Sequence, residues 1–273
     1  MPNFPPLDAS VQWKISTGAI RFRESGYRAT IDEILSSGLA TEVVGLISAG
    51  KEADVYLARL GGGPLAIKVY RLYRTSHRGG GAIKVDNMAH RAAFEFEMLR
   101  QAWKGGACVP TPAKRVENML AFRYLGTEDG PAPRLIDVAP VDPAGFQSEV
   151  VAAMERLVLA GVVHGDLSAF NILIHQDRPW FIDFSDSLRV DRLGQSPWQR
   201  LSEARQVLRR DLGGLASYFG RFGVGLAVDA IAGRLVLGLA RRADLARQSR
   251  RGDAVEPRLQ ADPPEPETLH EAD

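Results

Sequence analysis

The chain has 273 residues, 45% of them hydrophobic and 25% charged, which is the composition of an ordinary globular protein large enough for two lobes. Its formal net charge of +1 excludes a global field that would draw it to nucleic acid or to an anionic membrane. Its single cysteine, Cys108, excludes an intramolecular disulfide and favours a reducing compartment.

The first residues carry no recognisable export signal. Three prolines and an acid, Asp8, stand in the first ten positions, where a secreted protein would have a basic and then an apolar segment. Residues 1–29 show no sustained hydrophobic period, and we expect them to be poorly ordered. The absence of an export signal and the single cysteine together predict a cytoplasmic protein.

A short helix followed by strands is predicted after this segment. Thr30 can cap a helix that runs to Leu39, with Glu33 as its reciprocal partner three residues on. The β-branched and apolar residues of 42–60 then fall into two runs around a glycine-containing turn. A third strand is predicted from Leu65 to Tyr70.

The rest of the chain favours helices. Apolar residues recur at helical spacing in two long segments, and the region after Ser196 is helix-rich throughout. The expected helices are 86–103, 143–160 and those within 196–245, and the expected strands are 119–125 and a hairpin of 171–175 with 180–184. Strands followed by helices indicate an α+β protein with two lobes and a cleft between them.

The C-terminal part contains an apolar stretch and a charged tail. The stretch 222–240 is interrupted by Asp229 and Arg234, so it predicts a buried helix, and we expect no membrane partner. Residues 246–273 are rich in Pro, Glu, Asp and Arg, and we expect them to be disordered. The arginines of 241–251 fit either a solvated helix end or a surface that faces RNA.

One string carries most of the chemistry. Asp166 and Asn171 are five residues apart, and Asp183 follows Asn171 by twelve. Phosphoryl transfer needs a carboxylate beside the acceptor hydroxyl and oxygen ligands that hold Mg²⁺ on the phosphates, and this spacing supplies all three. Ordinary turn residues are the alternative interpretation. We expect the neighbouring His164 to be a buried structural residue that bonds backbone near Asp183.

A lysine in the third strand is the second candidate. Lys68 has apolar neighbours, which is an unfavourable place for an ammonium unless phosphate and a carboxylate pair with it. Its partner should come from the 86–103 helix. Glu95 and Glu97 lie about 200° apart on that helix, so only one can face the cleft. We prefer Glu97, with Glu95 as its competitor.

The turn from Ser48 to Glu52 is a phosphate-loop candidate. Gly50 would let backbone N–H groups approach oxygen, and Lys51 adds positive charge. Taken alone, the turn fits an ordinary hairpin equally well, since it is neither a Walker A motif nor a full G-x-G-x-x-G.

Together these motifs make the chain similar to the RIO family of atypical serine protein kinases, and the resemblance extends from about Thr30 to Val224. The family's S-T-G-K-E-A-x-V-Y loop is similar to the present loop, in which Ala49 replaces Thr. Asp186 stands where the family often has Gln. The matching segments are Ile47–Tyr56, Ala66–Tyr70, Val109–Pro112, Gly130–Leu135, the Asp166 loop, Ile182–Ser185 and Val207–Asp211.

The resemblance implies a bilobal, protein-kinase-like fold of the α+β class. It has a small antiparallel β-sheet N-lobe with one long helix and a minimal helical C-lobe. The kinase domain would span 30–245, with the N-lobe at about 30–125 and the C-lobe at about 126–245.

The resemblance also implies ATP and Mg²⁺ as cofactors, with Mn²⁺ as an alternative ion. Asp166 and Lys68 would be the catalytic residues, and Asn171 and Asp183 the metal ligands. A hinge at 122–125 would hold adenine through its backbone. The expected nucleotide contacts are Ser48, Gly50, Lys51, Glu52, Val55, Lys68, Glu97, Phe122, Arg123 and Leu125.

Three functions remain open from the sequence. The first is a RIO-type serine/threonine kinase whose main activity is autophosphorylation or ATP hydrolysis. Its substrate would be an unknown protein or the chain itself, and a ribosomal particle or rRNA would be its partner. The second is a small-molecule kinase of the aminoglycoside or choline type, whose loop is also His-Gly-Asp-x-x-x-x-Asn. The third is a nucleotide-binding scaffold with slow turnover.

Overall fold

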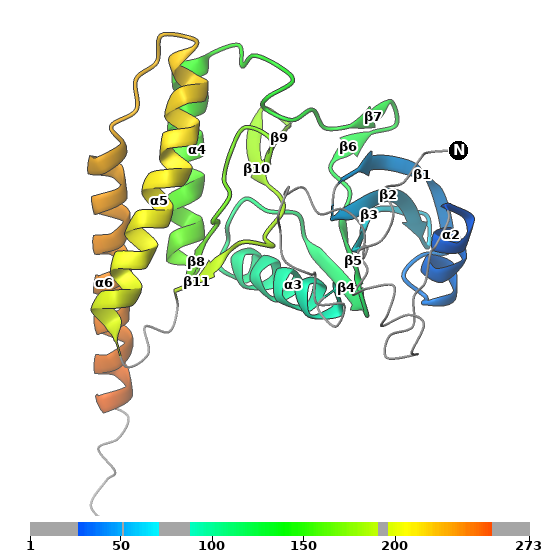
Figure 1. The fold of residues 1–273 in the computed structure, drawn as a ribbon, viewed down its shortest axis with the longest axis horizontal. Helices are drawn as coiled ribbons and strands as arrows, with labels where there is room; N and C mark the ends of the chain where they lie inside the picture. The colour runs from blue at the N-terminus through cyan, green and yellow to red at the C-terminus, as the bar shows by residue number, and fades with distance from the viewer. Residues whose placement is uncertain (1–26, 51, 71–87, 191–195, 253–273) are drawn as a thin grey trace, which may run out of the picture.

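The computed structural model describes residues 27–50, 52–70, 88–190 and 196–252. They form two lobes, a twisted sheet flanked by helices α2 and α3 and a body dominated by helices α4, α5 and α6 (Figure 1). The predicted bilobal α+β fold, with an antiparallel sheet in the N-lobe and a helical C-lobe, is therefore confirmed. No helix in the described part of the chain combines the length and the apolar character needed to cross a membrane.

The N-lobe is built on one antiparallel sheet with the strand order β1-β2-β3-β5-β4. Successive side chains of a strand point to opposite faces, so Ile67 and Val69 pack beneath α2 whereas Tyr70 packs beneath α3. Both faces are thus covered, which explains why every residue of β3 from Ala66 to Tyr70 is buried. The bounds are α2 Tyr27–Ser36, β1 Glu42–Ala49, β2 Ala53–Leu60, β3 Gly63–Tyr70, α3 Met88–Lys104, β4 Pro112–Val116 and β5 Met119–Arg123.

Helix α2 begins earlier than the sequence predicted. It starts at Tyr27, so Thr30 lies one turn inside the helix and is buried rather than capping its end. Tyr, Arg and Ala tolerate a helix interior, so nothing in their propensities forces a start at Thr30. Of the segment 1–29 predicted to be poorly ordered, residues 27–29 are helical and 1–26 lie outside the described residues.

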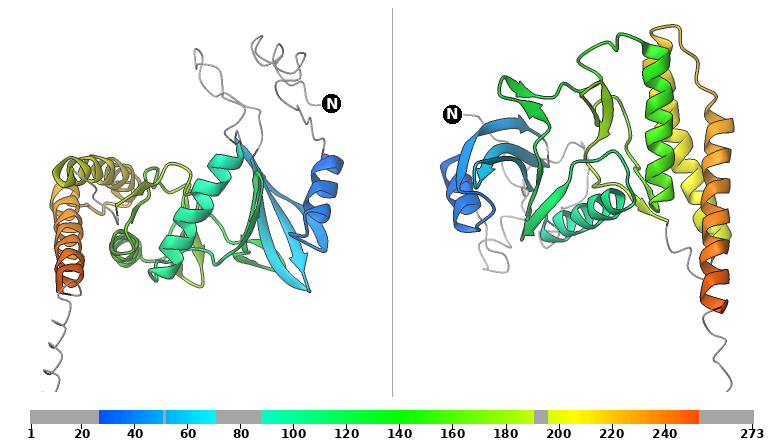
Figure 2. Two further views of the ribbon diagram at one scale, coloured as in Figure 1. Left: turned by 90° about the horizontal axis from the view of Figure 1, so that it is seen from below. Right: turned by 180° about the vertical axis from the view of Figure 1, so that it is seen from behind.

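The C-lobe packs its helices around one apolar core that also receives Ile172 and Phe181 from the hairpin of residues 172–181. Helix α4 starts where the sequence predicts it, because Asp142 caps it by accepting the Gly145 N–H at 3.0 Å and Pro143 occupies the first helical position. The views in Figure 2 show α4, α5 and α6 side by side at one end of the molecule. The bounds are β6 Gly126–Thr127, β7 Gly130–Pro131, α4 Pro143–Leu159, β8 Val162–Val163, β9 Ile172–His175, β10 Arg178–Phe181, β11 Leu188–Arg189, α5 Pro197–Gly220 and α6 Val228–Gly252.

Helix α6 continues beyond the predicted end of the kinase domain at residue 245. It runs to Gly252, so residues 246–252 of the predicted disordered tail are helical. Alanine, arginine and glutamine are good helix formers, and a charged composition does not by itself prevent a helix from continuing. Residues 253–273, and the arginine side chains of the predicted basic cluster after Arg241, lie outside the described part of the chain.

The apolar stretch 222–240 is only partly the buried helix that we expected. Its helical portion begins at Val228 and buries one stripe, Ala232, Leu235 and Leu239, while Leu237 on the other side is exposed. The helix is therefore amphipathic and covers the C-lobe core with one face.

Candidate active site

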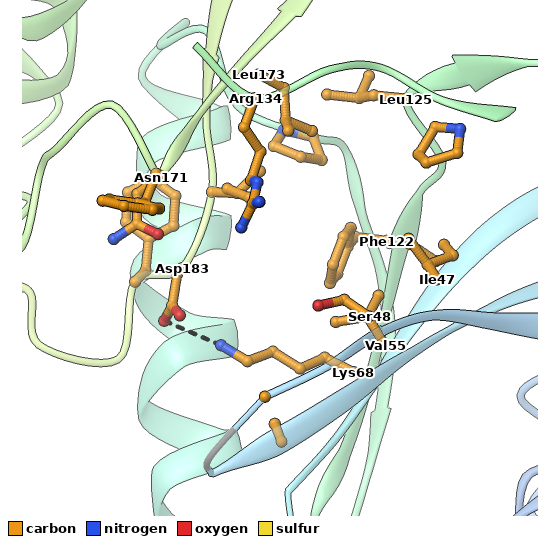
Figure 3. Close-up of a pocket in the computed structure, with 18 of the residues that line it drawn as sticks. Ile47, Ser48, Val55, Lys68, Phe122, Leu125, Arg134, Asn171, Leu173 and Asp183 are labelled. Carbon is orange, nitrogen blue, oxygen red and sulfur yellow. Dashed lines mark hydrogen bonds and ion pairs between the residues drawn. The ribbon is translucent and has the colours of Figure 1, made fainter. Parts of the chain in front are cut away.

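A cleft of about 910 Å³ lies between the two lobes. Side chains from the sheet and from the segments around β9 and β10 point into it (Figure 3), and Glu95 and Leu99 of α3 also line it. Most of the predicted site residues line this cleft, although they are spread over 136 positions of sequence from Ser48 to Asp183. They are Ser48, Gly50, Glu52, Val55, Lys68, Phe122, Arg123, Leu125, Asp166, Asn171 and Asp183. Lys51 lies outside the described residues.

Lys68 occupies the centre of the cleft floor. Its Nζ atom lies 2.9 Å from Glu95 Oε1 and 2.9 Å from Asp183 Oδ1, so one ammonium joins the sheet, helix α3 and the segment after β10. The dashed line in Figure 3 marks the bond to Asp183. Lys68 and Glu95 are both buried, and buried charges persist only when they are paired and hydrogen-bonded.

The partner of Lys68 on α3 is Glu95, and our preference for Glu97 is wrong. Glu97 lies on the exposed side of the helix, where it pairs with Arg100 at 2.8 Å. The buried stripe of α3 runs through Met88, Ala92, Glu95 and Leu99. Phe96 and Trp103 also fit helical spacing with these residues, but Trp103 is exposed, and a stripe that includes them is turned toward Glu97 and away from Glu95.

These charges hold one another in the ionised state. Burial alone would raise the pKa of Asp183, but the Lys68 ammonium and the Ser185 hydroxyl, which donates to Oδ1 at 2.8 Å, lower this pKa to about 2. Burial would likewise lower the pKa of Lys68, yet Glu95 and Asp183 raise it above its ordinary value. At neutral pH the Lys68 ammonium therefore faces the ionised Asp183 carboxylate on the cleft floor.

The loop after β8 brings Asp166 and Asn171 together. Asn171 Nδ2 donates to the Asp166 backbone carbonyl at 2.8 Å and to Asp166 Oδ2 at 3.1 Å. The amide nitrogen thus faces Asp166, and the amide oxygen remains as a ligand atom. Burial, and after it the nearby Asp186 carboxylate, raises the pKa of Asp166 above its ordinary value.

His164 has the structural role that we predicted. Its ring is buried, and Nε2 lies 3.0 Å from the Ile182 carbonyl oxygen, next to Asp183. Burial lowers the pKa of His164 to about 4, so the ring is neutral at neutral pH. A neutral ring can donate to the carbonyl only through Nε2–H, which leaves Nδ1 to accept the Asp166 N–H at 3.4 Å.

Two residues of α5 that we did not predict hold the same loop. Asp211 Oδ2 accepts the Gly165 N–H at 3.0 Å, and the Arg210 guanidinium donates to the Gly165 carbonyl. Burial raises the pKa of Asp211 to about 6. The sequence contained one signal for this role. Asp211 lies on the same face of α5 as the buried Leu208, Leu212 and Leu215, so its carboxyl group is in an apolar stripe. An acid in such a stripe needs a polar partner.

The other end of the cleft is apolar. Figure 3 shows Ile47, Val55, Phe122, Leu125 and Leu173 around one space, which suits a flat aromatic base. Some backbone groups at the edge of this space already have partners. The Arg123 N–H donates to the Thr111 carbonyl at 2.8 Å, and the Leu125 carbonyl accepts the Ala132 N–H at 2.9 Å.

Two predicted nucleotide contacts have other partners for their side chains. The Glu52 carboxylate pairs with Arg91 of α3 at 2.9 Å, which ties the turn between β1 and β2 to that helix. The Arg123 guanidinium lies 5.9 Å from the centre of the Trp180 ring. Within the turn itself, Gly50 donates its N–H to Ala53 at 2.9 Å, and a side chain at Gly50 would collide with the Ala53 carbonyl.

This geometry agrees with the comparison to known families. A family model described as the RIO domain matches residues 54–231. The chain belongs to the RIO family. Rio1, a RIO-type serine/threonine-protein kinase of Haloferax volcanii, is 33% identical to it over 218 residues, 74% of this chain and 72% of the relative. The Rio1 kinase of Methanocaldococcus jannaschii is 31% identical over 205 residues, 70% and 68% of the two chains.

Solved structures of RIO kinases have the same fold. The crystal structure of the Rio2 kinase-ADP/Mg²⁺-phosphoaspartate complex from Chaetomium thermophilum superposes with a TM-score of 0.56. It is 20% identical in sequence, and the match covers 89% of this chain and 85% of that one. The likeness supports the protein-kinase-like architecture described above.

The chain is accordingly a RIO-type serine/threonine kinase, and its chemistry is ATP-dependent phosphoryl transfer. Of the three functions that the sequence left open, the comparisons support a serine/threonine kinase of the RIO type.

Proposed function

We propose that this kinase transfers the γ-phosphoryl group of Mg²⁺-bound ATP with Asp166 as the catalytic carboxylate and Lys68 as the phosphate anchor. The observation that carries the proposal is the convergence of Lys68, Asp166, Asn171 and Asp183 on one cleft. Catalysis of this reaction is mainly positioning and neutralisation of charge. Asp166 would accept the proton of the attacking hydroxyl, a role that its raised pKa favours.

Asn171 and Asp183 are the residues that would hold the metal ion. Mg²⁺ prefers oxygen ligands, and the pair offers an amide oxygen and a carboxylate that is ionised and 41% exposed in the cleft. When bound, the metal neutralises charge on the phosphates. The Mg²⁺ named for the related Rio2 complex supports this ion, whereas Mn²⁺ rests on the sequence prediction alone.

ATP would lie along the cleft with its base at the apolar end. Val55, Phe122 and Leu125 would sandwich adenine, and the Arg123 carbonyl and Leu125 N–H would bond its edge. The turn at Ser48–Glu52, including Gly50 and Lys51, would then cover the phosphates. Glu52 would contribute by holding that turn against α3 through Arg91.

We further propose that self-labelling or ATP hydrolysis is the main activity. Only thirteen residues separate Asp183 from the first residue of α5, which leaves little chain for a docking platform that an extended protein substrate would need. The Rio2 complex named above contains a phosphoaspartate, so an aspartate of this chain is a candidate acceptor beside a serine.

The test is incubation of purified protein with γ-labelled ATP and Mg²⁺, followed by measurement of released phosphate and of label on the protein. Asp166→Ala and Asp183→Ala should abolish both signals while thermal unfolding stays cooperative. Acyl phosphate is labile to hydroxylamine and phosphoserine is not, so that treatment identifies the acceptor. Parent-like activity in both variants would disprove the assigned roles, and turnover far slower than in other kinases would favour the scaffold alternative.

A ribosomal particle or rRNA in the cytoplasm is the partner that we propose from the family resemblance. Sedimentation with small and large ribosomal subunits, with and without ATP, tests this. Association that changes with nucleotide would support the proposal, and its absence in both conditions would count against it.

A further inference from the structure

Tyr70 lies in the same buried network as Lys68, although we did not include it among the site residues. The two are separated by one residue on β3, so their side chains project from the same face of the sheet toward α3. The Tyr70 hydroxyl lies 2.5 Å from Glu95 Oε2, and both side chains are buried. This hydrogen bond joins the last residue of β3 to the glutamate that pairs with the central lysine.

The two oxygens of Glu95 have different partners. Oε1 accepts from Lys68 Nζ at 2.9 Å and from the Phe184 N–H at 3.1 Å. Oε2 accepts from Tyr70. A buried carboxylate has to satisfy both oxygens, and a short bond from a neutral hydroxyl satisfies one without competing for the ammonium. The Tyr70 bond therefore sets which oxygen faces Lys68.

Tyr70 is itself held rigidly. Its N–H donates to the Asn118 carbonyl at 3.0 Å, and its carbonyl accepts from Asn118 Nδ2 at 2.7 Å. The ring packs with Met88 and Ala92 of α3, and its centre lies 5.0 Å from Lys68 Nζ. The hydroxyl thus projects from a fixed ring, which makes it suited to orienting a partner.

We propose that Tyr70 is a positioning residue of the kinase reaction, whose hydroxyl fixes the Glu95 carboxylate so that Lys68 remains aligned with the phosphates of ATP. The inference rests on the proposed role of Lys68 as phosphate anchor. Lys68 also bonds Asp183, so it has two carboxylates between which to move. Fixing Glu95 from its far oxygen limits that movement.

The test is Tyr70→Phe, which removes one oxygen atom and keeps the ring. The variant loses a hydrogen bond to a charged group, which in the proposal keeps Lys68 aligned with the phosphates. We therefore expect kcat to fall about tenfold to a hundredfold. The KM for ATP should change less than about threefold, since the adenine contacts remain. A packing residue would instead lower the melting temperature and leave kcat unchanged, and that result would overturn the proposal.

Tyr218→Phe is the matched control. Its buried hydroxyl also donates to protein acceptors, the carbonyls of Leu135 at 2.8 Å and Val138 at 3.0 Å, but in the C-lobe. We expect this variant to lose stability and keep kcat within about twofold, because these bonds hold structure rather than the reacting groups. A fall in kcat equal to that of Tyr70→Phe would mean that any lost buried hydroxyl slows the enzyme, which contradicts a specific role.

A double-mutant cycle tests whether Tyr70 acts through Glu95. In a Glu95→Gln background, Tyr70→Phe should cost less than about twofold in kcat, since the carboxylate it orients is already gone. Fully multiplicative effects would show that the residues act independently and would overturn the proposal. Parent turnover compared with Asp166→Ala tests the proposed function separately, so failure of one hypothesis is distinguishable from failure of the other.

Discussion

The Asp211 carboxylate of α5 accepts the backbone N–H of Gly165 at 3.0 Å, one residue before the proposed catalytic carboxylate. A helix of the C-lobe therefore fixes the backbone from which Asp166 projects. The bond is buried, so its loss is not compensated by water.

We expect Asp211→Ala to destabilise the fold by about 1–3 kcal/mol, because it leaves the Gly165 N–H without its acceptor. The kcat should fall about tenfold or more as Asp166 loses its fixed position. Asp211→Asn is the control, since its amide oxygen can still accept and should retain most of the activity. Chemical denaturation and steady-state phosphate release measure the two effects, and an unaffected kcat in Asp211→Ala would contradict the positioning role.

The same residue predicts a dependence of stability on pH. The pKa of Asp211 is about 6 in the folded chain against an ordinary 3.8. The folded state therefore binds its proton more tightly, and the stability gained from this group is complete below about pH 4 and is lost as pH rises through 6. The melting temperature of the parent minus that of Asp211→Asn should fall between pH 4 and 6.5. A difference that stays constant or rises over this range would contradict the assignment.

Glu95 and Glu97 offer a matched pair on one helix. Glu95→Gln removes the charge opposite a buried ammonium. The kcat/KM for ATP should therefore fall by at least about tenfold, which corresponds to the loss of one hydrogen bond between charged groups. Glu97→Gln breaks only an exposed pair with Arg100, and its kcat/KM should stay within about twofold. A larger loss in Glu97→Gln than in Glu95→Gln would contradict the assignment of Glu95 as the functional partner of Lys68.

Gly165 should not accept a side chain. Its φ is +88°, and a Cβ atom there would lie 2.0 Å from the Asp186 carbonyl oxygen. Gly165→Ala should therefore cost several kcal/mol, of which about 1–2 kcal/mol comes from the left-handed backbone alone. Gly106→Ala has a similar φ of +76° and nothing within 4 Å, so it isolates the backbone cost. Equal melting temperatures for the two variants would contradict the predicted collision.

Activity should require a divalent cation. Chelation with excess EDTA is expected to stop phosphate release, and added Mg²⁺ should restore it, because carboxylate and amide oxygens suit that ion. Asn171→Ala should raise the Mg²⁺ concentration needed for half-maximal rate. Titration of Mg²⁺ and Mn²⁺ against initial rate provides the measurement, and activity that survives chelation would exclude the proposed metal role.

The parts of the site that lie close together in sequence were the most predictable. Asp166, Asn171 and Asp183 fall on one loop and the following hairpin, so their spacing alone encodes their meeting. Lys68 was predictable from its apolar strand, since a buried ammonium implies a partner. The boundaries of α2 and α6 were less predictable, because good helix formers continue past the signals that we took as a start and an end.

Long-range contacts were the least predictable. Glu95 and Glu97 are only two positions apart in the sequence. To choose between them, the orientation of α3 about its own axis has to be known to within about 100°. The bond from Asp211 to Gly165 crosses 46 positions of sequence, and no local pattern pairs them. From the sequence, Tyr70 is one more apolar residue at the end of a strand, and only the structure shows that its hydroxyl donates to Glu95.

Helix α3 is tied through a single carboxylate to strand β3 by two bonds and to the backbone of Phe184 by a third. Turning that helix outward would break all three bonds at once. The orientation of α3 and the position of Lys68 are thus coupled, so a rotation of this helix would displace the ammonium at the centre of the cleft.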